Sequence, residues 1–111
     1  MVKIFDIEGK KVGLKASAGT VRAYRDIFIR DLIADIAELE DEIIKNQKLS
    51  IESTNIAECV IYTLAKEYDP EIPEIKEWLD QFSPYFIYTA IVLVINMWKD
   101  NTKTLNKARK K

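Results

Sequence analysis

The sequence predicts a mainly α protein, a small helical domain of about four helices with an N-terminal β-hairpin. Three observations support this prediction. Apolar residues recur at steps of three and four over most of the chain, which is typical of amphipathic helices. Within residues 2–16 they alternate at spacing two instead, which is typical of strands. The 111 residues contain only three glycines and three prolines, which suits one domain with short connections.

The first expected element is the hairpin over residues 2–16. Residues 2–7 are mostly β-branched and aromatic, Gly9 marks a turn, and every second residue from Val12 to Ala16 is apolar. A turn between two such runs predicts paired antiparallel strands. Because a lone two-stranded hairpin is marginally stable in water, we expect it to pack on the helices or to pair with another chain.

A helical body is expected over residues 20–103, and its first helix from Val21 to about Asn46. Thr20 is the expected N-cap, because its hydroxyl can accept a hydrogen bond from the first turn. One face of this helix is apolar over its whole length, which predicts a central position in the fold. The residues of that face are Val21, Tyr24, Phe28, Leu32, Ile36, Leu39 and Ile43, widened by Ile29 and Ile33.

Charged residues occupy another face of the same predicted helix. Arg22, Asp26 and Arg30 are spaced four residues apart. One interpretation is a solvated charge ladder, in which each pair contributes about 0.2–0.5 kcal/mol. The other is that these arginines, together with Arg25, bind a carboxylate of a partner, since a guanidinium suits bidentate pairing.

Three further elements follow. A helix from about Glu52 to Tyr68 should end before Pro70, because the residue that precedes proline avoids the helical region. A short helix is expected from Glu74 to about Phe82. The last helix should run from Tyr85 to about Lys103, after Ser83 as N-cap and Pro84 at the first helical position. The basic tail over residues 104–111 is expected to be flexible.

The last helix is apolar nearly all round from Tyr85 to Ile95. Two stripes share its surface. The first comprises Tyr88, Ile91, Ile95 and Trp98, and the second comprises Phe86, Ala90, Leu93, Val94 and Met97. We expect one stripe to face the core and the other to contact a partner or a second copy, with full burial of both as the alternative.

The sequence shows no pattern typical of catalysis, cofactor binding or metal binding. It contains no histidine, which removes the commonest general base and most zinc sites. Asp35, Glu38 and Glu42 share a predicted helix face, but no glycine-rich ligand loop accompanies them, so we expect a solvated face. Cys59 has no cation within one turn on its own helix, and we expect a small buried apolar side chain. We therefore expect a protein that is not an enzyme.

Charge and hydropathy also limit the possible partners. Five of the 17 cations follow Asp100, which leaves 12 cations against 18 acids in the first hundred residues. An acidic body disfavours a large nucleic-acid surface. The most apolar run, residues 85–98, is shorter than the roughly 20 residues that a membrane span needs. The N-terminus lacks the apolar core of a signal peptide and there is a single cysteine, so we expect a cytoplasmic protein without membrane or nucleic-acid partners.

Two stretches of the chain resemble the tail assembly chaperones of long-tailed bacteriophages and prophages of Gram-positive bacteria. The first is GLKASAGTVRAYR at residues 13–25, with RDL at residues 30–32. The second comprises NIAEC from Asn55, LAK from Leu64, Asp69-Pro70 and EWLDQF from Glu77. The resemblance implies a non-enzymatic protein of the host cytoplasm that binds the helical tape measure protein, keeps it soluble and assists tail tube assembly. Tail tube protein is a second implied partner.

The candidate partner-binding residues come from both ends of the helical body. They are Tyr85, Tyr88, Ile91, Ile95 and Trp98 of the last helix, and Arg22, Arg25 and Arg30 of the first. A groove lined by the first group suits an amphipathic helix, and aromatic side chains are favoured in such contacts. Two alternative functions are a small helical DNA-binding regulator, in which Asp26 and Asp31 would repel phosphate, and a head–tail structural adaptor.

Overall fold

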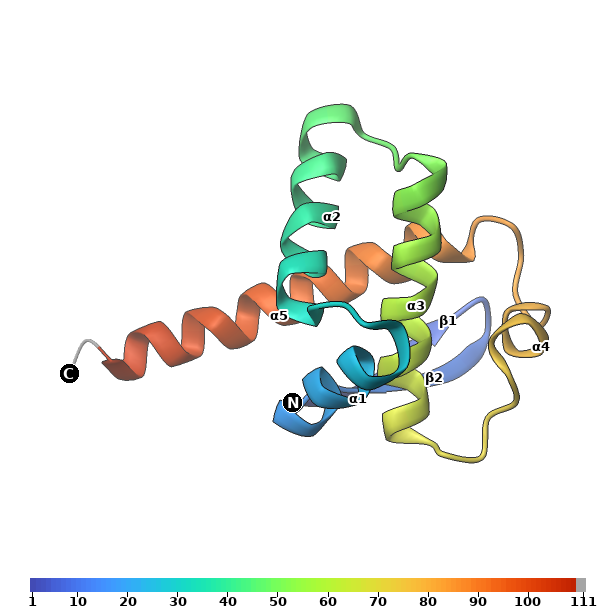
Figure 1. Ribbon diagram of the computed structural model, residues 1–111, viewed down its shortest axis with the longest axis horizontal. Helices are drawn as coiled ribbons and strands as arrows, with labels where there is room; N and C mark the ends of the chain where they lie inside the picture. The colour runs from blue at the N-terminus through green and yellow to red at the C-terminus, as the bar shows by residue number, and fades with distance from the viewer. Residues whose placement is uncertain (110–111) are drawn as a thin grey trace.

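A computed structural model describes the backbone of residues 1–109 and the side chains of residues 1–101 (Figure 1). It has the expected mainly α architecture with an N-terminal hairpin. The described part contains five helices rather than about four. The elements are β1 (Val2–Ile7), β2 (Lys10–Lys15), α1 (Ala18–Phe28), α2 (Leu32–Asn46), α3 (Ile51–Tyr68), α4 (Ile75–Leu79) and α5 (Phe86–Arg109).

The hairpin forms as predicted and packs on the helices. β1 and β2 pair antiparallel, with Val2 opposite Lys15 and Ile7 opposite Lys10. Both turn residues, Glu8 and Gly9, have positive φ (54° and 78°), which matches the twist of the flanking strands. β2 buries its apolar side chains against α3. This packing supplies the support that an isolated hairpin lacks.

The turn of the hairpin is also tied to the segment that precedes α5. The Glu8 carboxylate accepts hydrogen bonds from the Ser83 backbone N–H (2.8 Å) and from the Ser83 hydroxyl (2.7 Å). These bonds hold the pKa of Glu8 below its ordinary value. The Ser83 oxygen in turn accepts from the Tyr85 N–H (3.2 Å), in keeping with the expected capping role.

The expected helix from Val21 to Asn46 is wrong, because α1 and α2 are separate helices. Ile29 ends α1 in the left-handed conformation (φ 56°), and Asp31 caps α2 by accepting from the Ala34 N–H (3.1 Å). We call residues 29–31 the elbow. α2 leaves the elbow in a sharply different direction from α1 (Figure 1). The break lies within an uninterrupted apolar stripe, so hydrophobic periodicity gave no sign of it.

The predicted N-cap is also wrong, by three residues. Ser17 caps α1, and Thr20 is the third residue of the helix. Their side chains form a reciprocal capping box: the Thr20 N–H donates to the Ser17 oxygen (3.3 Å) and the Ser17 N–H donates to the Thr20 oxygen (3.0 Å). Thr20 is fully buried, which a cap at the solvent-exposed start of a helix would not be.

The central helix is α3, not the first helical segment as expected. α3 contacts β2, α1, α2 and α5. It begins after the N-cap Ser50 and ends before Asp69-Pro70, close to the predicted bounds. The residues that it buries most completely are Ala57, Val60, Ile61 and Leu64. The sheet, the elbow and α5 therefore all take their positions from α3.

The last two helices differ from the prediction in length. α4 ends at Leu79, short of the expected Phe82, and α5 continues to Arg109, beyond the expected Lys103. α5 crosses the body of the protein, and its C-terminal part projects beyond the other elements (Figure 1). Residues 110–111, the end of the expected flexible tail, lie outside the described residues. None of the helices in the described part is long and apolar enough to cross a membrane.

Candidate partner-binding surface

A buried hydrogen-bond network fixes the elbow between α1 and α2. Asp35, on α2, is only 3% exposed. Its carboxylate accepts from the Tyr24 hydroxyl (2.6 Å), from Arg30 Nε (2.7 Å) and from Arg30 Nη2 (3.0 Å). Burial, reinforced by the bond to the carboxylate, raises the pKa of Tyr24 far above its ordinary value. Because Tyr24 lies on α1 and Asp35 on α2, this network sets how the two helices meet.

The expected solvated carboxylate face does not exist as one unit. Asp35 is buried, whereas Glu38 is exposed. Glu42 accepts hydrogen bonds from the Ser50 N–H (2.7 Å) and from the Ser53 hydroxyl, and these bonds lower its pKa. The three acids therefore serve different structural roles. No group of three potential metal ligands occurs among the described residues.

Next to the elbow lies a hollow of about 370 Å³ with mostly apolar walls, which we call the elbow hollow. Ile29 and Ile33 form part of its wall and are 82% and 56% exposed. Exposed aliphatic side chains of this size, placed side by side around a concavity, are typical of a contact surface. Its lining residues are Val21, Arg25, Ile29, Arg30, Asp31 and Ile33.

The elbow hollow continues into a groove of about 300 Å³ between α2 and α5, which we call the α2–α5 groove. Ile33 lines both concavities. The groove also contains Ile36 and Ala37 from α2 and Ile95 and Trp98 from α5. Glu40 and Lys99 form a salt bridge of 3.5 Å across its end. Together the hollow and the groove make one apolar surface with charged residues at its margins, which is how small-molecule and helix-binding sites are usually built.

A third concavity of about 150 Å³ extends this surface past the salt bridge. Glu40, Ile95 and Lys99 line both concavities, and Ile44 and Val92 are added. Ile44 is 65% exposed. The apolar surface therefore follows α2 from the elbow almost to the C-terminal end of the helix.

The five candidate residues of this segment, Tyr85 just before α5 and four on α5, do not form one surface. Ile91 and Ile95 are buried in the core, and Trp98 is half-buried beside the α2–α5 groove. Tyr85 and Tyr88 are exposed (77% and 44%), and neither lines the groove. Two of the five therefore belong to the core.

The expected division of α5 into a core stripe and an exposed stripe holds only for the core stripe. Most of the second stripe is buried, including Phe86, Ala90, Val94 and Met97. The first stripe is split between the core and the surface. The reason is that α5 contacts α3 along one side and β1 along another, so the buried arc is wider than one stripe.

The three candidate arginines have different surroundings. Arg22 forms an exposed ion pair with Asp26 (3.7 Å). Arg30 is bound to Asp35 because α1 ends before it, so of the ladder interpretation only the Arg22–Asp26 pair is present. Arg25 is exposed and lines the elbow hollow. Of the three, Arg25 is therefore the one placed on the apolar surface without an ion pair among the described residues.

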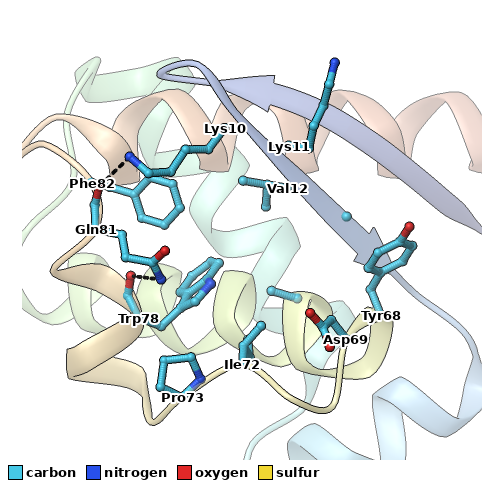
Figure 2. Close-up of a pocket in the computed structure, with 12 residues that line it drawn as sticks. Lys10, Lys11, Val12, Tyr68, Asp69, Ile72, Pro73, Trp78, Gln81 and Phe82 are labelled. Atoms are coloured by element: carbon cyan, nitrogen blue, oxygen red, sulfur yellow. Dashed lines mark hydrogen bonds between the residues drawn. The ribbon is translucent and has the colours of Figure 1, made fainter.

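A separate pocket of about 390 Å³ lies between β2, the end of α3 and α4 (Figure 2). Its charged side chains already have partners within the protein. Lys10 Nζ donates to the Gln81 carbonyl (3.0 Å) and lies over the Phe82 ring. Lys11 pairs with Asp6 (3.5 Å), and the Asp69 carboxylate accepts from the Glu71 N–H. We therefore interpret this pocket as part of the packing between the hairpin and the α4 region.

Cys59 is half-buried and packs against the core. Burial, with the neighbouring Glu58 carboxylate, raises the pKa of its thiol. A protonated thiol is a poor nucleophile, which agrees with the interpretation of Cys59 as an apolar side chain, although it is less buried than expected.

Comparison with known proteins gave no further assignment: no protein-family model, no curated protein and no solved structure matches this chain.

Proposed function

We propose that this protein is a non-enzymatic tail assembly chaperone of a long-tailed phage or prophage, which binds the tape measure protein and assists tail tube assembly. The resemblance of residues 13–82 to that family suggests the biological role. The observation that carries the proposal is the apolar surface formed by the elbow hollow and the α2–α5 groove. A tape measure segment, as an amphipathic helix that aggregates before assembly, is a suitable occupant.

The physical basis of binding would be burial of apolar side chains on both partners. Ile29, Ile33 and Ile44 are all more than half exposed in the free protein. Covering each of them removes up to about 1.5–3 kcal/mol of unfavourable hydration. The Glu40–Lys99 salt bridge, Arg25 and Arg30 lie at the margins of the apolar surface. Charges in such positions contribute more to the register and association rate of a partner than to its affinity.

The proposal is tested by co-expression with the candidate tape measure protein encoded by a neighbouring gene. A pull-down then measures binding, and the soluble fraction of that partner is measured with and without this protein. The informative variant is Ile33→Asp. Ile33 lines both concavities, and because its side chain is 56% exposed, the substitution should not disturb the core. We expect at least a tenfold loss of binding, since the change removes an apolar contact and adds a charge that must be desolvated. Ile51→Asp is the matched control. Ile51 is 85% exposed and is the first residue of α3, which follows the end of α2 that lies away from the elbow.

Other outcomes would point to the alternative functions. If the protein neither binds the tape measure candidate nor changes its solubility, the chaperone proposal is wrong. Strongly salt-dependent binding to duplex DNA would favour the regulator. Recovery of the protein from mature phage particles would favour the head–tail adaptor over an assembly factor.

A further inference from the structure

Ile29 has a backbone conformation that is unfavourable for its β-branched side chain, although its N–H donates to the Arg25 carbonyl (2.8 Å) as is usual at a helix end. It ends α1 with φ 56°, in the left-handed region. Glycine or asparagine usually occupies such a position, because a β-branched side chain crowds the backbone there. The Ile29 side chain is 82% exposed, so packing within the chain offsets little of this cost. Unfavourable local conformations of this kind are concentrated at functional sites.

Arg25 lies one turn before Ile29 and lines the same elbow hollow. The neighbouring cations are engaged: Arg22 pairs with Asp26, and Arg30 pairs with Asp35. Arg25 forms no ion pair in the part of the chain that the structure describes. The hollow therefore presents an aliphatic wall beside an unneutralised guanidinium.

Asp31 also lines the elbow hollow, and its carboxylate already has a hydrogen-bond donor within the protein. Its carboxylate accepts from the Ala34 N–H and caps α2. The N-terminal end of α2, to which Asp31 belongs, carries a partial positive charge of its own. The negative charge of Asp31 is therefore offset in part by this helix end, and Arg25 has no ion-pair partner among the described residues.

We infer that the elbow hollow selects an amphipathic helix that carries a carboxylate about one turn from a large aliphatic side chain. The aliphatic group packs against Ile29 and Ile33, and the carboxylate pairs with Arg25. The one-turn spacing of Arg25 and Ile29 sets the matching spacing on the partner. This inference rests on the proposed function, because it specifies the chemistry of the tape measure segment that the surface would bind.

The inference predicts opposite effects of one substitution on stability and on binding. Ile29→Gly relieves the left-handed conformation, so the melting temperature should stay the same or rise. The same change removes the aliphatic wall, so binding of an acidic amphipathic helix should weaken about tenfold. Ile51→Ala removes an equally exposed isoleucine at the other end of α2 and should leave binding unchanged. A purely structural Ile29 would show no loss of binding.

The charge requirement is tested with two synthetic helical peptides of about 20 residues that share one leucine stripe. One carries glutamates beside the stripe and the other carries lysines at the same positions. Fluorescence anisotropy should show about tenfold tighter binding of the glutamate peptide, from attraction in one case and repulsion in the other. Arg25→Glu should abolish or reverse this preference, whereas Arg22→Glu, one turn earlier, should preserve it.

Equal affinities, tighter binding of the lysine peptide, or no binding of either peptide would each overturn the inference. So would a dimer that Ile29→Gly dissociates in analytical ultracentrifugation, since the occupant would then be a second copy. The two proposals fail separately. Loss of the glutamate preference with an intact tape measure pull-down removes only this inference, and the converse result removes only the proposed function.

Discussion

Replacing Asp35 by alanine should destabilise the protein far more than its place in an acidic helix suggests. The Asp35 carboxylate accepts three hydrogen bonds, one from Tyr24 and two from Arg30. Without it, the buried Tyr24 hydroxyl loses its partner, which costs about 1–3 kcal/mol. The Arg30 side chain is 40% exposed and regains water, so its lost ion pair adds no more than about 1 kcal/mol. The expected loss in the free energy of unfolding is therefore about 1–4 kcal/mol.

Urea unfolding followed by far-ultraviolet circular dichroism measures this loss. Asp41→Ala on the same helix is the matched control, because the Asp41–Lys45 pair (3.1 Å) is exposed and its removal should cost less than about 0.5 kcal/mol. Adding Tyr24→Phe to Asp35→Ala should recover about 1 kcal/mol, since the orphaned hydroxyl is removed. If Asp35→Ala costs no more than Asp41→Ala, the network does not hold the elbow and the reasoning is wrong.

Three further predictions follow from the packing. Above about pH 10 the free energy of unfolding should fall by up to about 1.4 kcal/mol per pH unit. The reason is that Tyr24 releases its proton in the unfolded chain but retains it in the folded protein, where its pKa is raised. Urea titrations at several pH values measure this slope, and Tyr24→Phe should make it shallower. Gly13→Ala should cost about 1 kcal/mol, because a Cβ there would overlap the Tyr68 ring, and Tyr68→Ala in the same chain should abolish that penalty in a double-mutant cycle. Tyr88→Asp, on the exposed side of α5, should change the free energy of unfolding by less than about 1 kcal/mol, whereas Ile91→Asp should abolish cooperative unfolding by placing a charge in the core.

The candidate site shows where reasoning from spacing succeeds and where it ends. Of the eight candidate residues, four line the apolar surface: Arg25, Arg30, Ile95 and Trp98. Ile29, Ile33 and Ile44 were not candidates. Ile29 and Ile33 widen the apolar face that predicts a central helix, but an apolar residue at helical spacing carries no information on which neighbour, if any, covers it.

The sequence itself contains one signal of the hydrogen-bond network at the elbow. Asp35 lies between Leu32 and Ile36 at steps of three and one, with Leu39 one turn further, so it occupies the buried stripe of α2. A carboxylate in such a stripe needs a hydrogen-bonding partner, because burying an unpaired charge is costly. The nearest donors in the sequence that could serve are Arg30 and Tyr24, and both bind Asp35 in the structure.

The sequence alone determined the fold class and most of the element bounds. Alternation at spacing two and a glycine turn specified the hairpin, and periodicity with Pro70, Ser83 and Pro84 specified where α3 ends and where α5 begins. These features are local, since each depends on residues within a few positions of one another.

Only the tertiary structure decided the elbow, the central place of α3 and the exposed apolar surface. The elbow depends on the hydrogen bonds that Asp35 accepts from Tyr24 and Arg30. It also depends on the left-handed backbone conformation of Ile29, a position where the sequence has no glycine or asparagine to predict a turn. Which isoleucines stay exposed depends on how α5 crosses the body, and that crossing is set by the combined packing of α3 and β1 rather than by any spacing along the chain.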